Sequence, residues 1–267
     1  VDRVFDSPDR FTGVENLLAV YGYALQLYCD FSGYSDIAIG IALLLGFKLM
    51  ENFNYPFKAK SISDFWRRWH ISLSSWLLEY VFRPLQLSFR DLRKAGNILA
   101  LVITFVLVGF WHGASWAFLV WGLIHGIYMG VGLLIQGPKR KLYMKYKIAN
   151  SKILGGLQIF VTFNLVAFSF IFFRANNFSQ ALDVINQIIY YFKPSVFIQF
   201  IETFTPTFVL IFLGFLFHFL PSSLLDKTIN QYSKLNVFIQ AVVLTFIIWL
   251  ASQVQSADLQ PFIYFQF

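Results

Sequence analysis

The sequence predicts an all-α, polytopic membrane protein: a bundle of transmembrane helices with interfacial or re-entrant helices between them. Three observations predict this class. The chain is 57% hydrophobic and only 13% charged, whereas soluble domains average about 25% charged residues. Aromatic residues make up 20% of the chain, which suits contact with lipid and with the lipid–water interface. Several uncharged stretches reach the roughly 20 residues that a helix needs to cross a hydrocarbon core.

The first long apolar stretch is Asn16–Phe47, and its predicted course is open. As one helix it would be about 48 Å long, more than the core thickness of about 30 Å. Asp30 and Asp36 also interrupt it. One long tilted helix and two segments bent near Ser32-Gly33 both fit this pattern.

The remaining spans follow from uncharged runs. Ala95–Pro138 contains no Asp, Glu, Lys or Arg and is long enough for two crossings, with the break falling most naturally at Gly109–Gly113. Three further runs are each long enough for one crossing: Ile153–Phe173, Thr203–Leu225 and Leu235–Ala257. We count six spans in all, give or take one.

Two segments are expected to lie at the membrane surface. Ile62–Leu85 mixes Arg with Trp every few residues, a pattern typical of an interfacial or re-entrant helix. Phe178–Phe192 is expected to form a helix lying flat on the outer face, because its apolar residues recur at helical spacing. These residues are Ala181, Leu182, Ile185, Ile188 and Ile189.

The basic residues predict the topology. Lys48–Lys94 holds nine of them, and Lys139–Lys152 holds six with no acids. Two crossings separate these loops, so both lie on one side, and the positive-inside rule makes that side cytoplasmic. This clustering also explains the net charge of +7 without a nucleic-acid partner.

The cysteine content and the motif search limit the kinds of site that the chain is expected to hold. A single cysteine, Cys29, excludes a disulfide framework within the chain, and no metal site or soluble-enzyme motif is predicted. Residues 1–267 are expected to form one membrane domain. The sequence lacks an initiator Met, and we interpret it as the C-terminal part of a longer chain.

His112 is the strongest catalytic candidate among the four histidines. It lies between Trp111 and Gly113, at the predicted junction of two spans, where Gly109 and Gly113 permit a sharp turn and close approach of a substrate. An imidazole at this position could act as a general base towards a hydroxyl. A loop histidine that caps a helix end is the alternative interpretation.

The other histidines differ in their surroundings. His125 belongs to a small-xxx-small pattern, Gly122–Gly130, and is predicted to make an interhelical hydrogen bond. His218 lies among aromatic residues and is interpreted as structural. His70 lies in the Trp-Arg segment, far from His112 in sequence. Asp30 and Asp36 are expected to be paired or to line a wet cavity, with Arg67, Arg68 or Arg83 as possible partners.

Four sequence blocks resemble the membrane-bound O-acyltransferase family, in particular its bacterial alginate O-acetylation branch, which is related to the D-alanyl transfer protein of teichoic acid synthesis. The blocks occur in the family's order, and the resemblance runs from about Asn16 to Phe267. They are YCDFSGYSDIAIG (Tyr28–Gly40), NFNYPF (Asn52–Phe57), SDFWRRWHISLSSW (Ser63–Trp76) and GFWHGASW (Gly109–Trp116).

The resemblance implies that His112 is the essential membrane histidine and His70 its supporting partner. It implies a tunnel that a thioester donor enters from the cytoplasm, and the acceptor hydroxyl from outside. Asp30, Asp36, Arg67, Arg68 and Trp111 are expected to shape its vestibule.

The expected function is transfer of an acyl group, most simply acetyl, to a hydroxyl of an exported polysaccharide or to a partner acetyltransferase in the periplasm. The donor would be acyl-coenzyme A or an acyl carrier protein, with no tightly bound cofactor and no metal. The expected location is the bacterial cytoplasmic (inner) membrane, with lipid around the helices. A transporter or flippase, or a non-catalytic scaffold for a periplasmic acyltransferase, also fits the pattern of broken helices and buried acids.

Overall fold

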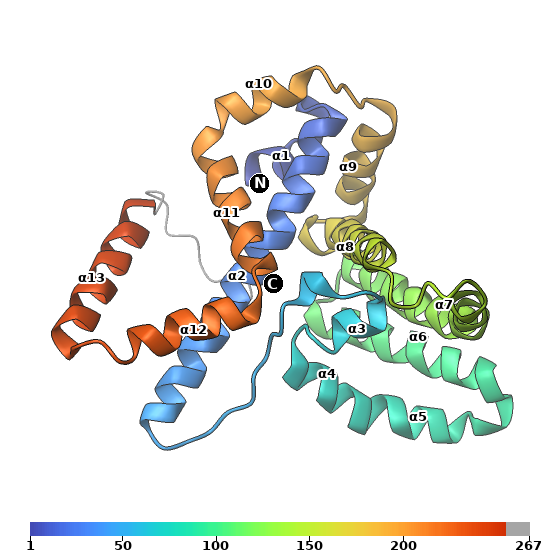
Figure 1. Cartoon of the computed structure of the whole chain (residues 1–267). Helices are drawn as coiled ribbons and strands as arrows, with labels where there is room; N and C mark the ends of the chain where they lie inside the picture. Colours follow the sequence, from blue (N-terminus) through green and yellow to red (C-terminus); the bar gives the residue numbers. More distant parts are fainter. Residues whose placement is uncertain (255–267) are drawn as a thin grey trace. The chain divides into compact units, whose positions relative to one another are not determined.

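The computed structural model describes residues 1–254, and regular structure within this range is helical throughout (Figure 1). The predicted all-α membrane class is therefore confirmed. Short 3₁₀ turns (η1, η2, η4) and one π-helical turn (η3) connect the α-helices. In chain order the elements are α1 (Asp2–Asp6), η1 (Pro8–Arg10), α2 (Gly13–Leu44), η2 (Pro56–Lys58), α3 (Ile62–Trp66), α4 (Ile71–Leu77), η3 (Leu78–Phe82), α5 (Arg83–Ser88), η4 (Arg90–Leu92), α6 (Arg93–His112), α7 (Trp116–Tyr146), α8 (Lys152–Arg174), α9 (Phe178–Tyr190), α10 (Val196–Thr203), α11 (Thr205–Phe219), α12 (Ser222–Tyr232) and α13 (Val237–Val254).

The chain divides into two compact units, Val1–Ile211 and Phe212–Phe267, the second described as far as residue 254. Helix α11 runs across the boundary, and α12 and α13 belong to the second unit. Every residue of the candidate site lies in the first unit. That the whole chain forms one membrane domain stays a prediction.

Four helices of the described chain are long and apolar enough to cross a membrane: α2, α6 with the turn before it, α7 and α8. Helix α2 is continuous over 32 residues, which resolves the open choice at Ser32-Gly33 in favour of one long helix. The two crossings predicted within Ala95–Pro138 are α6 and α7, and the break between them, Gly113–Ser115, begins where the predicted break Gly109–Gly113 ends. Helix α8 confirms the span predicted at Ile153–Phe173.

The described residues contain four candidate spans, or five if a bent pair of helices counts as one span, which is the lower limit of the predicted six give or take one. That pair is α10 and α11, bent by 95°. Pro206 follows the break, and a proline inside a continuous helix would lose a hydrogen bond and clash with the preceding turn. Pro221 follows the end of α11, so Thr203–Leu225 is not one straight span. The apolar part of α13 is short, Val237–Leu250, and part of the predicted span Leu235–Ala257 lies outside the described residues.

The Trp-Arg segment does not form the single helix that the sequence predicts for Ile62–Leu85. It consists of α3, a turn, and then α4, η3 and α5 in succession. The turn ends at His70, whose φ of 45° places it in the left-handed region, where an α-helix cannot continue. Trp76 and Tyr80 further along are more than half exposed, and the interfacial position of this segment stays a prediction.

Helix α9 confirms the helix predicted at Phe178–Phe192, although the face it buries differs in part. Ala181 and Val184 are fully buried, whereas Leu182 and Ile189 are exposed. Gly13, the first residue of α2, lies against the backbone of this helix at Gln187 and Ile188, so α9 packs closely on the start of α2. Its flat position on the outer face stays a prediction.

Helices α6 and α7 pack along each other as an antiparallel pair (Figure 1). Their backbones approach so closely that a Cβ at Gly122 would lie 2.2 Å from the carbonyl oxygen of Phe105, and a Cβ at Gly109 would lie 2.3 Å from that of Phe118. Small residues allow this approach, as the small-xxx-small pattern predicts. The pair therefore holds the α6–α7 junction, and His112 with it, in a defined place.

Candidate active site

His112 is the last residue of α6, where the chain turns towards α7. The turn needs glycine at position 113, because a Cβ there would lie 2.9 Å from ring atoms of Phe118. The His112 side chain is buried among aromatic rings: the ring centroids of Trp111, Phe173 and Trp121 lie 4.8, 5.0 and 5.2 Å away. The imidazole is thus enclosed by rings from α6, α7 and α8.

His70 lies at the turn between α3 and α4, and its ring is partly buried. Its Nδ1 is 3.2 Å from Oδ1 of Asn52, and its ring packs edge-on against Phe31 with centroids 4.7 Å apart. Burial lowers the pKa of His70 to about 4, because an imidazolium loses hydration when it is buried. The ring is therefore neutral at neutral pH. A series of ring contacts links this turn to His112: the ring of Trp69, next to His70, lies 5.6 Å from that of Phe170, and Phe170 lies 6.3 Å from Phe173, which packs on His112.

The turn that carries His70 is held by the block Asn52–Phe57. The backbone N–H of Ile71 donates to the carbonyl of Asn52, and that of Asn54 donates to the carbonyl of Arg68, each at 2.9 Å. Between these two bonds Trp69 is 4% exposed, and its ring lies 5.1 Å from that of Phe53. The block Asn52–Phe57 and the turn at His70 are therefore bonded and packed against each other.

Trp121 connects the two histidines of α6 and α7. It is 2% exposed, and its ring lies edge-on to both His112 and His125, with centroids 5.2 and 5.1 Å away. His125 is fully buried; its Nδ1 accepts from Nε1 of Trp66 at 3.2 Å and its Nε2 lies 2.9 Å from Oγ of Ser169. The interhelical hydrogen bond predicted for His125 is confirmed, and it joins α7 to both α3 and α8.

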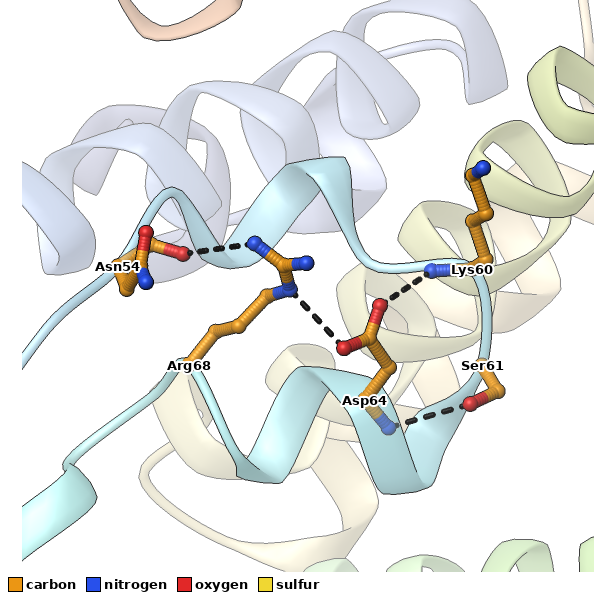
Figure 2. A network of polar contacts seen from close by, with 5 residues as sticks. All are labelled: Asn54, Lys60, Ser61, Asp64 and Arg68. Carbon is orange, nitrogen blue, oxygen red and sulfur yellow. Dashed lines mark hydrogen bonds and ion pairs between the residues drawn. The ribbon is translucent and has the colours of Figure 1, made fainter. Parts of the chain in front are cut away.

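A second polar network joins α3 to the loop before it and the turn after it (Figure 2). Asp64 Oδ1 pairs with Nε of Arg68 at 3.0 Å, and its Oδ2 accepts from the backbone N–H of Lys60 at 3.1 Å. Arg68 also donates from Nη1 to the carbonyl oxygen of Asn54 at 3.3 Å. Ser61 caps α3 by accepting from the N–H of Asp64. This network holds α3 against the loop before it.

The remaining predicted vestibule residues are more dispersed. Arg67 is exposed, Trp111 is 60% exposed although its ring touches His112, and Asp36 is exposed while Asp30 is partly buried. Two of the arginines considered as partners of these acids pair within their own segments instead. Arg68 pairs with Asp64 and Arg83 with Glu79, in both cases four residues away. The vestibule role of all five residues stays a prediction.

Sequence reasoning assigned no role to Asn52, Ser72 or Trp121. Asn52 opens a block that carried the family resemblance, so its position was visible but its function was not. Trp121 and His125 are four residues apart on α7 and therefore share a face, which was a usable signal. Within residues 1–254 no group of three His, Cys, Asp or Glu side chains is placed to hold a metal ion.

These features define a class: a multi-pass membrane protein with one histidine, His112, enclosed at the junction of two apolar helices and a second, His70, at a turn beside them. The chain belongs to the membrane-bound O-acyltransferase family, whose model matches residues 10–180. The matched range contains both of these histidines, as well as Asn52 and Trp121. The resemblance predicted from the four sequence blocks is thereby confirmed.

Several characterised or assigned proteins are similar to this chain. A peptidoglycan O-acetyltransferase of Helicobacter pylori is 41% identical over 188 residues, which is 70% of this chain and 34% of that protein. A probable alginate O-acetylase of Azotobacter vinelandii is 40% identical over 184 residues, covering 67% of this chain and 34% of that protein. A teichoic acid D-alanyltransferase of Bacillus subtilis is 36% identical over 169 residues, covering 61% and 42%. The chain thus spans about a third of the length of the first two relatives.

Proposed function

We propose that this protein is a membrane O-acyltransferase of the bacterial cytoplasmic membrane. It moves an acyl group, most simply acetyl, from a thioester donor on the cytoplasmic side to a hydroxyl of an exported polysaccharide or to a partner acetyltransferase. The observation that carries the proposal is the burial of the His112 imidazole among aromatic rings at the α6–α7 junction. The relatives named above act on peptidoglycan, alginate and teichoic acid, so the similarity favours a cell-envelope polymer without choosing one.

In the proposed reaction His112 is the general base. It takes the proton of the acceptor hydroxyl while the hydroxyl oxygen attacks the thioester carbonyl carbon. The new ester C–O bond forms, the C–S bond breaks, and the proton leaves with the thiol. A site enclosed by Trp121, Phe173 and Phe118 excludes water, which strengthens polar interactions with the developing charge and limits hydrolysis of the donor.

His70 acts in this proposal as a supporting group that positions the acceptor or shares its proton. The thioester is a coenzyme A or acyl-carrier-protein substrate, and no tightly bound cofactor or metal takes part. Asp30, Asp36, Arg67, Arg68 and Trp111 line the route by which the donor reaches His112.

The proposal is tested with the intact protein purified into lipid vesicles and given radiolabelled acetyl donor on one side. An acyltransferase converts the thioester to an ester on an added polysaccharide or partner acetyltransferase. A transporter or flippase would move the label across the membrane without changing its chemical form. A scaffold would do neither, and its histidines would be replaceable.

The direction of transfer depends on the topology, which we propose from the charge distribution. Both basic loops lie in the cytoplasm, so Lys60→Cys and Lys141→Cys variants in a Cys29→Ser background resist a membrane-impermeant thiol reagent added to intact cells. Both react after the membrane is made permeable, which is the control for accessibility. Labelling of either position from outside would contradict donor entry from the cytoplasm.

A further inference from the structure

We propose that Asn52 is a positioning residue for His70, whose amide oxygen fixes the orientation and tautomer of the imidazole. The inference rests on the proposed function in one respect: it takes His70 to be the supporting group of the reaction. The contacts that carry it are hydrogen bonds and do not depend on which polymer is acylated.

Asn52 accepts hydrogen bonds from three consecutive residues. Its Oδ1 lies 3.2 Å from Nδ1 of His70, and it accepts from Oγ of Ser72 at 2.9 Å and from the backbone N–H of Ser72 at 3.2 Å. Its backbone carbonyl accepts from the N–H of Ile71 at 2.9 Å. One residue therefore holds the side chain of His70 and the first turn of α4 together.

The amide group of Asn52 has a defined orientation. The backbone N–H of Ser72 can only donate, so the amide atom that it contacts is the oxygen, and Nδ2 on the other side donates to Oγ of Ser35 on α2 at 3.2 Å. An amide oxygen can only accept, so Nδ1 of His70, 3.2 Å away, can bond to it only as a donor. Oγ of Ser72 lies 3.3 Å from Nδ1 but 2.9 Å from the amide oxygen, to which it donates its single proton. Nδ1 of His70 must therefore carry the proton, which leaves Nε2 as the ring nitrogen with a lone pair.

The backbone conformation at His70 is one that needs support from neighbouring residues. The residue is left-handed, with φ of 45° and ψ of 55°, a region that L-residues other than glycine seldom adopt. The edge-on contact with Phe31 restricts the ring from one side, and Asn52 restricts it from another. The groups facing the ring are neutral (Asn52, Ser72 and Phe31), and His112 is the titratable group that interacts with it.

A purely structural role for Asn52 is the competing explanation, since it also satisfies an N–H at the start of α4. Asn52→Asp separates the two roles. It keeps an acceptor for Ser72 but places a negative charge beside Nδ1–H, which favours the imidazolium. A helix cap would tolerate the change, whereas a histidine that directs Nδ1–H at this group would become easier to protonate.

The first measurement is the pH dependence of acyl transfer by the intact protein, per unit of inserted protein. In Asn52→Asp the acid limb, where His70 gains its proton, moves to higher pH by about one unit or more. Asn54→Asp is the matched control: it adds the same charge two residues away, on an exposed residue that contacts Arg68 through its backbone N–H and carbonyl. Equal profiles for the two Asp variants would overturn the inference.

The second measurement does not require activity. Nitrogen NMR of histidine-labelled protein, with the His70 signals identified by their loss in His70→Gln, reports which ring nitrogen carries the proton. The expected result is Nδ1–H in the wild type and a mixture of tautomers in Asn52→Leu. An Nε2–H ring in the wild type would overturn the positioning role, while the proposed function would still stand or fall on the His112 variants.

Discussion

The indole N–H of Trp66 donates a hydrogen bond to Nδ1 of His125, although the two residues are 59 positions apart in the chain. Trp66 ends α3, four residues before His70, and His125 lies on the helix that begins just after His112. The bond therefore ties the segment with the supporting histidine to the helix pair with the candidate base. It also fixes the tautomer of His125, since Nδ1 accepts and Nε2 must donate to Ser169.

Loss of this bond is expected to destabilise the protein without removing its chemistry. His125→Ala leaves the buried indole N–H of Trp66 without an acceptor, which costs roughly 1–3 kcal/mol, and it lowers the melting temperature in detergent. Trp66→Phe in the His125→Ala background should then cost less than in the wild type, because the donor no longer has a partner to lose. Strict additivity of the two changes would show that the bond contributes no stability.

Close packing of α6 against α7 makes a second prediction. Gly122→Ala places a Cβ 2.2 Å from the carbonyl oxygen of Phe105, so the helices must move apart and the melting temperature falls. Gly132→Ala on the same helix is the matched control, because nothing lies within 4 Å of a Cβ there; it should be neutral or slightly stabilising, since alanine favours helix over glycine by up to about 1 kcal/mol. Similar melting temperatures for both variants would contradict the close approach.

The two adjacent arginines of the Trp-Arg segment are expected to differ. Arg68→Ala removes the ion pair with Asp64 and the bond to the Asn54 carbonyl. Because the pair is partly exposed, its loss should cost less than about 1 kcal/mol. The local effect should be clearer: faster hydrogen exchange in peptides covering residues 52–66, where Lys60 donates its N–H to Asp64. Arg67→Ala, at an exposed position, should leave exchange there unchanged; an equal effect would argue against the network.

Much of the fold was predictable because membrane helices are determined by local composition. Uncharged length predicted α6, α7 and α8, and the glycines around His112 predicted the break between the first two. The end of α11 at Phe219 was missed because Pro221 lies inside the uncharged run Thr203–Leu225, and uncharged length alone gives no boundary there. The turn at His70 was missed for a different reason: its left-handed backbone is stabilised by Asn52, and a contact between distant residues leaves no local pattern.

The candidate site also combines features that were predictable from local sequence with features that were not. His112 was predictable from its glycine-flanked junction, and the pairing of His70 with it was implied by the resemblance rather than by spacing. Arg68 and Arg83, two of the three possible partners considered for the acids of α2, form ion pairs with acids one helical turn away, at positions 64 and 79. Such local pairs are common on helices and were visible in the sequence.

The central claim is that His112 is the base of the acyl transfer reaction. The measurement that tests it most directly is the rate of polysaccharide acetylation per unit of correctly inserted protein, for alanine variants of the four histidines in the intact protein. His112→Ala should lose about 10²–10⁴ in rate while its insertion and melting temperature stay close to the wild type. His70→Ala should show an intermediate loss, and His125→Ala and His218→Ala should lower yield or melting temperature more than specific activity. Near-normal specific activity of His112→Ala would contradict the account.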